Sequence, residues 1–229
     1  MSVWLSNISN SQGLKEILNQ HYPFTITQIS FHREMIGFVY FLTTVQHKYV
    51  VKLFRHIHKK EALQSIQIIQ YLQRHNFPVT SIILTHDLDS YIHIKTSQTE
   101  YIAVVYEYIY GTKPDIATEI TTLGTQVKQL HTIMKHYPNS LIERGKSFYI
   151  DRFIKLLQKL HYSENKVQDL IDYGSEIWNC LALLPQGFCH GDLHSGNIFH
   201  TPSSANVFID FDVASYSYHI IDIATLCTT

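Results

Sequence analysis

Short stretches of alternating apolar and polar residues dominate the first half of the chain, and this period of two is typical of β-strands. Residues 38–43 and 49–54 are rich in β-branched and aromatic residues and are joined by a polar segment, which predicts a hairpin. On the same grounds we expect further strands at residues 24–30, 82–84, 91–95 and 101–109.

Two helices are expected among these strands. Residues 11–21 place their apolar side chains at helical spacing, and residues 59–75 do the same. The second helix should end before Pro78, because a residue that precedes proline disfavours helical geometry.

The apolar period changes from two to 3.6 after Pro114, which predicts a helical second half. Apolar stripes at this spacing lie within residues 123–134, 148–160 and 167–184. Strands followed by helices predict an α+β fold with two lobes. We place the β-rich lobe at residues 1–108 and the helical lobe at residues 109–229, with the break near Gly111.

Composition limits the classes of partner. A chain of 229 residues that is 45% hydrophobic can bury a substantial core. The formal net charge is -1 and only 16% of the residues are charged. Binding to nucleic acid or to an acidic membrane surface calls for a basic excess, so the sequence predicts neither.

The same sequence indicates a soluble cytoplasmic protein. No apolar run approaches the roughly 20 residues that span a bilayer. Residues 1–20 lack the basic start and apolar stretch of a signal peptide. Cys180, Cys189 and Cys227 form no Cys-x-x-Cys pair, which favours reduced thiols.

Candidate chemistry is concentrated in residues 190–197, which read His-Gly-Asp-Leu-His-Ser-Gly-Asn. Asp192 can accept the proton of an attacking hydroxyl. Asn197 and the later Asp210 supply oxygen atoms of the kind that hold Mg²⁺ against phosphates. Apolar residues flank the segment on both sides, and residues 207–211 read as a short buried strand that carries Asp210.

Residues 184–224 resemble the catalytic core of the aminoglycoside phosphotransferase and choline kinase superfamily, and the resemblance extends back with falling clarity to about Phe31. Its matching residues are His190, Asp192 and Asn197 in the pattern His-x-Asp-x-x-x-x-Asn, the metal-binding Asp210, and Asp222-Ile223-Ala224. The resemblance implies a bilobal protein-kinase-like fold. It also implies ATP and Mg²⁺ as cofactors and a small molecule with a hydroxyl group as phosphate acceptor.

Two further residues follow from this resemblance. Lys52 would contact the α- and β-phosphates, and strand alternation places it opposite Val51 and Leu53. A helix Glu should hold this lysine, and Glu61 is the only acidic residue in the expected segment. The family position falls about one helical turn later, near Ser65, so Glu61 matches in residue type rather than in position.

Residues 104–111 resemble the hinge segment of the family, where adenine pairs with backbone groups. A match on Gly111 places the acceptor and the donor at the Glu107 carbonyl and the Ile109 amide. The expected phosphate-covering loop contains Gly37 alone, whereas protein kinases use several glycines to let backbone amides approach phosphate.

Two alternatives stand beside this interpretation. His190, Asp192 and His194 also match His-x-Asp-x-His, a spacing found in zinc and dinuclear-metal hydrolases. The neighbouring glycines favour a loop over the extended strand that this spacing needs, and zinc leaves Asn197 and Lys52 without a role. A non-catalytic kinase fold is the other alternative, because the sequence stops soon after Asp222-Ile223-Ala224 and looks short at its C-terminus beside the family.

The acceptor is left open by the sequence. Aminoglycosides are polycations and call for a concentrated acidic wall, whereas acidic and basic residues are interspersed through the helical half. The sequence therefore does not favour an aminoglycoside, and choline, another amino alcohol, a sugar or homoserine remain candidates. Choline would need an aromatic cage, for which the tyrosines are numerous enough.

Overall fold

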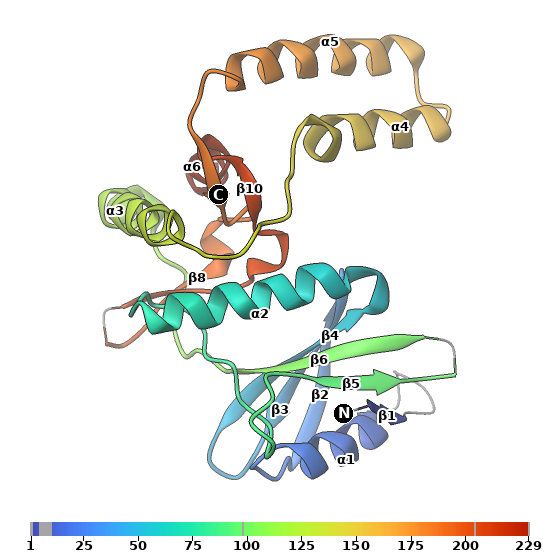
Figure 1. The fold of residues 1–229 in the computed structure, drawn as a ribbon, viewed down its shortest axis with the longest axis vertical. Helices are drawn as coiled ribbons and strands as arrows, with labels where there is room; N and C mark the ends of the chain where they lie inside the picture. The colour runs from blue at the N-terminus through green and yellow to red at the C-terminus, as the bar shows by residue number, and fades with distance from the viewer. Residues whose placement is uncertain (1, 5–10, 98, 204, 229) are drawn as a thin grey trace. The chain divides into compact units, whose positions relative to one another are not determined.

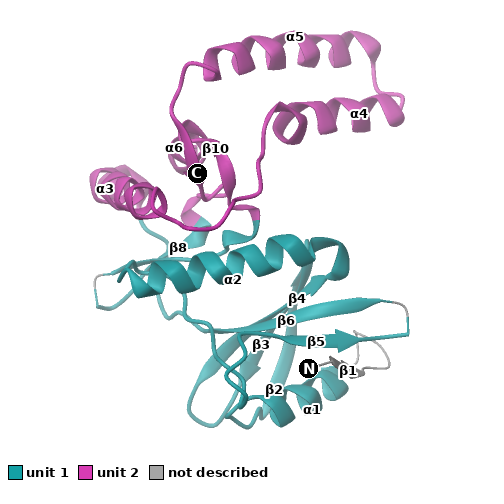
Figure 2. Ribbon diagram, viewed as in Figure 1, with its two compact units in different colours: residues 1–114, 196–212 teal, residues 115–195, 213–229 magenta. Residues whose placement is uncertain are grey.

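The computed structural model describes residues 2–4, 11–97, 99–203 and 205–228. They form two compact units, one of residues 1–114 with 196–212 and the other of residues 115–195 with 213–229 (Figure 2). These units are groups of packed residues rather than segments divided at one point of the chain. The lobe boundary after residue 108 therefore stays a prediction.

A six-stranded sheet forms the first unit (Figure 1). All neighbouring strands are antiparallel except β1 and β5, which are parallel. In spatial order the strands are β1 (Ser2–Trp4), β5 (Ile92–Lys95), β6 (Glu100–Glu107), β4 (Lys48–Arg55), β3 (Gly37–Thr43) and β2 (Gln28–Glu34).

Each face of this sheet is covered by one helix. Val51 and Leu53 of β4 are fully buried in a core with the apolar side chains of α1 (Ser11–His21). The opposite face carries Lys52, which lies across from Val104 of β6. Helix α2 (Lys59–Arg74) follows a short 3-10 turn, η1 (His56–His58), and packs on β4 and β6. The predicted hairpin and both predicted helices are confirmed.

Two of the strands predicted in the first half of the chain differ from the structure. The strand expected at residues 24–30 is shifted to β2, because the Ile26 amide donates to the Asn19 side chain in α1 at 2.7 Å instead of joining the ladder. Residues 82–84 form no strand. They meet β6 at an isolated bridge between Ile82 and Tyr106, with the Ile83 amide donating to the Val105 carbonyl.

A hairpin from late in the sequence completes the first unit. Strands β8 (Ile198–His200) and β9 (Asn206–Phe208) are antiparallel and lie between two 3-10 turns, η3 (Ser195–Asn197) and η4 (Phe211–Val213). Phe208 is fully buried and bridges to Val79, and His200 bridges to Thr112. These contacts attach residues 196–212 to the sheet-containing unit.

The second unit is mainly helical, as the change of period after Pro114 predicts. Helix α3 (Ile116–Met134) begins at Asp115, whose side chain accepts a hydrogen bond from the Ala117 amide. No helix in the described part of the chain is both long and apolar enough to cross a bilayer. The remaining elements are a π-helical turn η2 (Ser147–Asp151), the paired helices α4 (Arg152–Lys159) and α5 (Glu164–Leu181), the antiparallel strands β7 (Gln186–Cys189) and β10 (Ser215–Tyr218), and α6 (Ile220–Cys227).

Candidate active site

The first unit contains a lysine between two carboxylates. Lys52 Nζ lies 2.9 Å from Asp210 Oδ1 and forms a second ion pair with Asp212. Arg33 of β2 approaches the other Asp210 oxygen at 3.6 Å. The structure thus brings Lys52 and Asp210, which are far apart in the sequence, into direct contact.

The backbone conformation at Asp210 turns the chain between the two carboxylates. Asp210 has a φ of +64°, a left-handed conformation that Asp and Asn tolerate better than other side chains. A strand cannot continue through this geometry, so β9 ends at Phe208 and a 3-10 turn follows. The expected strand at residues 207–211 is therefore wrong in extent, and Asp212 lies in the 3-10 turn that follows.

Asn197 lies at the other end of the same hairpin. Ile198 pairs with Phe208, and the Ile209 amide donates to the Asn197 carbonyl at 3.0 Å. Asn197 and Asp210 therefore flank the open end of β8 and β9. A neutral amide oxygen and a carboxylate are a suitable partial ligand set for Mg²⁺, which takes its remaining ligands from phosphates and water.

The electrostatics of the cluster follow from burial. Burial raises the pKa of Asp212 to about 7, and the Asp210 carboxylate adds to this rise while Lys52 opposes it. Burial alone would lower the pKa of Lys52, but Asp212 and Asp210 outweigh it and raise the pKa above its ordinary value. The ammonium group is thus held charged inside the unit.

The predicted pairing between Lys52 and Glu61 is not made in this structure. Glu61 lies in the first turn of α2, and the ion-pair partners of Lys52 are Asp210 and Asp212. Ser65, one turn after Glu61, is the α2 residue that reaches the cluster, and its hydroxyl donates to Asp212 at 3.3 Å. The ion pair between Lys52 and Asp212 joins residues far apart in the sequence, and no local pattern encodes it.

The segment predicted as a hinge lies at the end of β6. Glu107 is the last residue of the strand, and its amide donates to the Ser81 carbonyl at 2.9 Å. Ile109 follows just beyond the strand, and the next residues are tied to β8 by paired backbone hydrogen bonds between Thr112 and His200. The use of Glu107 and Ile109 by adenine stays a prediction.

Gly37 has a packing role that is visible in the structure. A Cβ atom at this position would lie 2.1 Å from the Leu53 carbonyl oxygen of the neighbouring strand. The close approach of β3 to β4 thus requires glycine at this position. This packing requirement does not depend on whether the adjoining turn covers phosphate.

The second unit holds the segment with Asp192. The buried Asp222 of α6 accepts hydrogen bonds from the amides of His190 and Gly191, both at 2.8 Å. His131 of α3 lies 2.9 Å from the same carboxylate. Helix α6 therefore holds the backbone immediately before Asp192 through the Asp of the Asp-x-Ala motif, and α3 contacts the same carboxylate.

Gly191 is required for this arrangement. Its φ is +81°, and a Cβ atom would lie 2.6 Å from the Val213 carbonyl oxygen. The Asp192 side chain is about half exposed, and His194 Nε2 lies 3.7 Å from one of its oxygens. The described residues include His190, Asp192 and His194. Among the described residues, no group of three His, Cys, Asp or Glu is placed to hold a metal ion.

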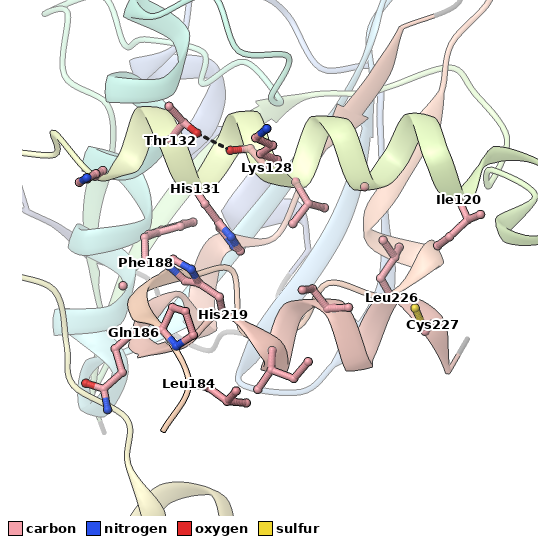
Figure 3. Close-up of a pocket in the computed structure, with 17 residues that line it drawn as sticks. Ile120, Lys128, His131, Thr132, Leu184, Gln186, Phe188, His219, Leu226 and Cys227 are labelled. Atoms are coloured by element: carbon pink, nitrogen blue, oxygen red, sulfur yellow. Dashed lines mark hydrogen bonds between the residues drawn. The ribbon is translucent and has the colours of Figure 1, made fainter. Parts of the chain in front are cut away.

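A cavity of about 810 Å³ lies in the second unit between α3, β7 and α6 (Figure 3). His131 and His219 face each other on its wall, with ring centroids 4.2 Å apart. Burial, and then the neighbouring His131, lowers the pKa of His219. Asp192 does not line this cavity. The cavity instead contains His131, which contacts the Asp222 carboxylate that holds the loop.

Comparison with known proteins places these features in context. The phosphotransferase enzyme family matches residues 29–229. Probable ethanolamine kinase A of Dictyostelium discoideum is 38% identical over 66 residues, which are 28% of this chain and 19% of that protein. The match therefore spans less than a fifth of that relative.

Solved structures share the fold at low sequence identity. Amicoumacin kinase hAmiN, in complex with AMP-PNP, Ca²⁺ and Ami, has a TM-score of 0.77 at 23% identity and covers 95% of this chain and 68% of its own. Spectinomycin phosphotransferase APH(9)-Ia, in complex with ADP and spectinomycin, has a TM-score of 0.67 at 17% identity, with 95% and 73% covered. Choline kinase LicA of Streptococcus pneumoniae has a TM-score of 0.65 at 17% identity, with 94% and 73% covered. The predicted α+β protein-kinase-like fold is confirmed.

Proposed function

This chain belongs to the phosphotransferase enzyme family, and from that premise we propose that it transfers the γ-phosphate of ATP to a hydroxyl group of a small molecule. The observation that carries the proposal is the cluster of Lys52 and Asp210 beside Asn197 in one compact unit. A buried cation next to a metal-type oxygen pair suits the triphosphate of a nucleotide.

Each residue has a distinct task in this proposal. Lys52 binds the α- and β-phosphates, and the Glu107 carbonyl and Ile109 amide bind the adenine edge. Asn197 and Asp210 hold Mg²⁺, which neutralises charge on the phosphates when it is bound. The backbone hydrogen bonds to Asp222 present Asp192 to the acceptor.

Asp192 acts as the base in the transfer step. The acceptor oxygen forms a bond to the γ-phosphorus while the bond from that phosphorus to the bridging oxygen of ADP breaks. The hydroxyl proton passes late to Asp192, because the transition state of phosphoryl transfer is largely dissociative. ADP and the phosphorylated acceptor are the products.

Small amino alcohols are the acceptors to test first. The related proteins named above include an ethanolamine kinase and a choline kinase, and a further structural neighbour is an aminopropanol kinase. We propose to test ethanolamine, choline and aminopropanol first in an acceptor panel, and aminoglycosides and sugars second. Transfer to each acceptor is measured by ADP release.

The nucleotide site is tested by thermal unfolding. We expect ATP with Mg²⁺ to raise the melting temperature by a few degrees, because saturation at about 100 times Kd adds roughly 2.7 kcal/mol. Asp210→Ala should abolish the part of this rise that depends on Mg²⁺, since it removes the only carboxylate of the proposed ligand pair.

The exposed Asp87→Ala, in a turn of the first unit, is the matched control and should respond as the unaltered protein does. Two further controls are ATP in the presence of EDTA and, separately, Zn²⁺ without ATP. A rise with Zn²⁺ alone would favour the hydrolase alternative, and ATP binding without ADP release on any acceptor would favour a non-catalytic fold.

A further inference from the structure

The two carboxylates that contact Lys52 differ in their surroundings. The Asp210 side chain is 19% exposed and faces Arg33 as well as Lys52. The Asp212 side chain is only 3% exposed, and Lys52 is the cation with which it pairs. Asp210 is thus accessible to a metal ion, whereas Asp212 is enclosed with the lysine.

A hydroxyl group of α2 contacts Asp212. Ser65 donates its hydroxyl proton to Asp212 Oδ1 at 3.3 Å. Burial, and then the charges of Asp212 and Asp210, raise the pKa of Tyr106 on β6 well above its ordinary value.

Helix α2 offers a hydroxyl here where the family resemblance calls for a carboxylate. Its only acidic residue, Glu61, lies in the first turn, and Ser65 occupies the position that reaches the cluster. Lys52 must nevertheless keep a carboxylate when Asp210 turns to a metal ion, because a buried ammonium group without a partner is strongly disfavoured.

We propose that Asp212 is the residue that positions Lys52 for nucleotide, in place of a helix carboxylate. The proposal rests on the proposed function, since it concerns the lysine that would bind ATP. Asp212 pairs with Lys52 Nζ from the buried side, and Ser65 orients the carboxylate. Asp210 is thereby released for the metal without leaving the lysine unpaired.

The test moves the carboxylate from one element to another. Asp212→Ala removes it, and Ser65→Glu with Asp212→Ala returns it from α2. Glu exceeds Ser by as many non-hydrogen atoms as Asp exceeds Ala, so the double variant conserves the filled volume. Kd for MgATP and the Mg²⁺ concentration at half-saturation are measured for both, with Lys52→Ala, Lys52→Ala/Asp212→Ala and the exposed Asp87→Ala alongside.

We expect Asp212→Ala to weaken MgATP binding roughly tenfold or more, because it removes a hydrogen-bonded partner of a buried charge. The double variant Ser65→Glu/Asp212→Ala should bind within about threefold of the unaltered protein. In the Lys52→Ala background, loss of Asp212 should weaken binding no further, since the two residues act as one unit. The Mg²⁺ requirement should not change in any Asp212 variant.

Three outcomes would overturn the proposal. One is normal MgATP affinity in Asp212→Ala, and another is a raised Mg²⁺ requirement at unchanged ATP affinity, which would make Asp212 a metal ligand. The third is a folded Ser65→Glu/Asp212→Ala variant that fails to bind MgATP. This result would overturn the proposal even if Asp212→Ala alone does not fold. An unaltered protein that does not bind MgATP would instead refute the proposed function and this inference with it.

Discussion

Replacing Asp192 with Asn is expected to lower the turnover of phosphate transfer by about 10²–10⁴-fold while MgATP still binds. Asn has the shape of Asp but cannot accept the hydroxyl proton. The loop itself should persist, because Asp222 holds its backbone through the amides of His190 and Gly191.

The measurement is kcat by ADP release, with whichever acceptor of the panel gives the highest rate, beside Kd for MgATP from thermal unfolding. Asp169→Asn is the matched control, since that side chain is 72% exposed on α5. A kcat within threefold of the unaltered protein would remove Asp192 from the role of base. A parallel loss of MgATP binding would show that the substitution disturbs more than proton transfer.

Replacing Asp222 with Ala is expected to destabilise the second unit by about 3–5 kcal/mol. The substitution leaves the buried amides of His190 and Gly191 without their acceptor and removes the partner of His131. Asp222→Asn should cost less, because its side-chain carbonyl can still accept one of the three contacts.

Urea unfolding followed by circular dichroism checks this expectation, with Asp169→Ala as the control for loss of an exposed carboxylate. Turnover should fall as well in any Asp222 variant that folds, since the backbone before Asp192 is no longer held. If Asp222→Ala were as stable as the control, the hydrogen bonds to Asp222 would not be what supports the loop.

Much of the fold could be predicted because local pattern and tertiary structure agree. The hairpin of β3 and β4 and the helices α1 and α2 have strong periodicity, and each appears close to its expected bounds. The predicted kinship with a phosphotransferase family is confirmed by the family match over residues 29–229. That kinship was recognisable because the motif residues within 190–210 are closely spaced and chemically specific.

The errors in strand bounds arose where a side-chain hydrogen bond or a backbone conformation competes with the apolar pattern. The Asn19 side chain takes the Ile26 amide away from the sheet and shifts β2 along the chain. A left-handed backbone at Asp210 ends β9 early, although Val207 to Phe211 is apolar enough for a longer strand. Neither effect is visible in the periodicity of the segment it alters.

The sequence by itself determined the class of fold, the family and the residue types of the site, since period, spacing and motif are local properties. Only the tertiary structure decided which groups meet. Lys52 contacts Asp212 and not Glu61, because η4 carries Asp212 into the buried cluster while Glu61 stays in the first turn of α2. Asp222 supports the loop of Asp192 because α6 packs behind it. A contact between residues far apart in the sequence is set by packing, and no local pattern records it.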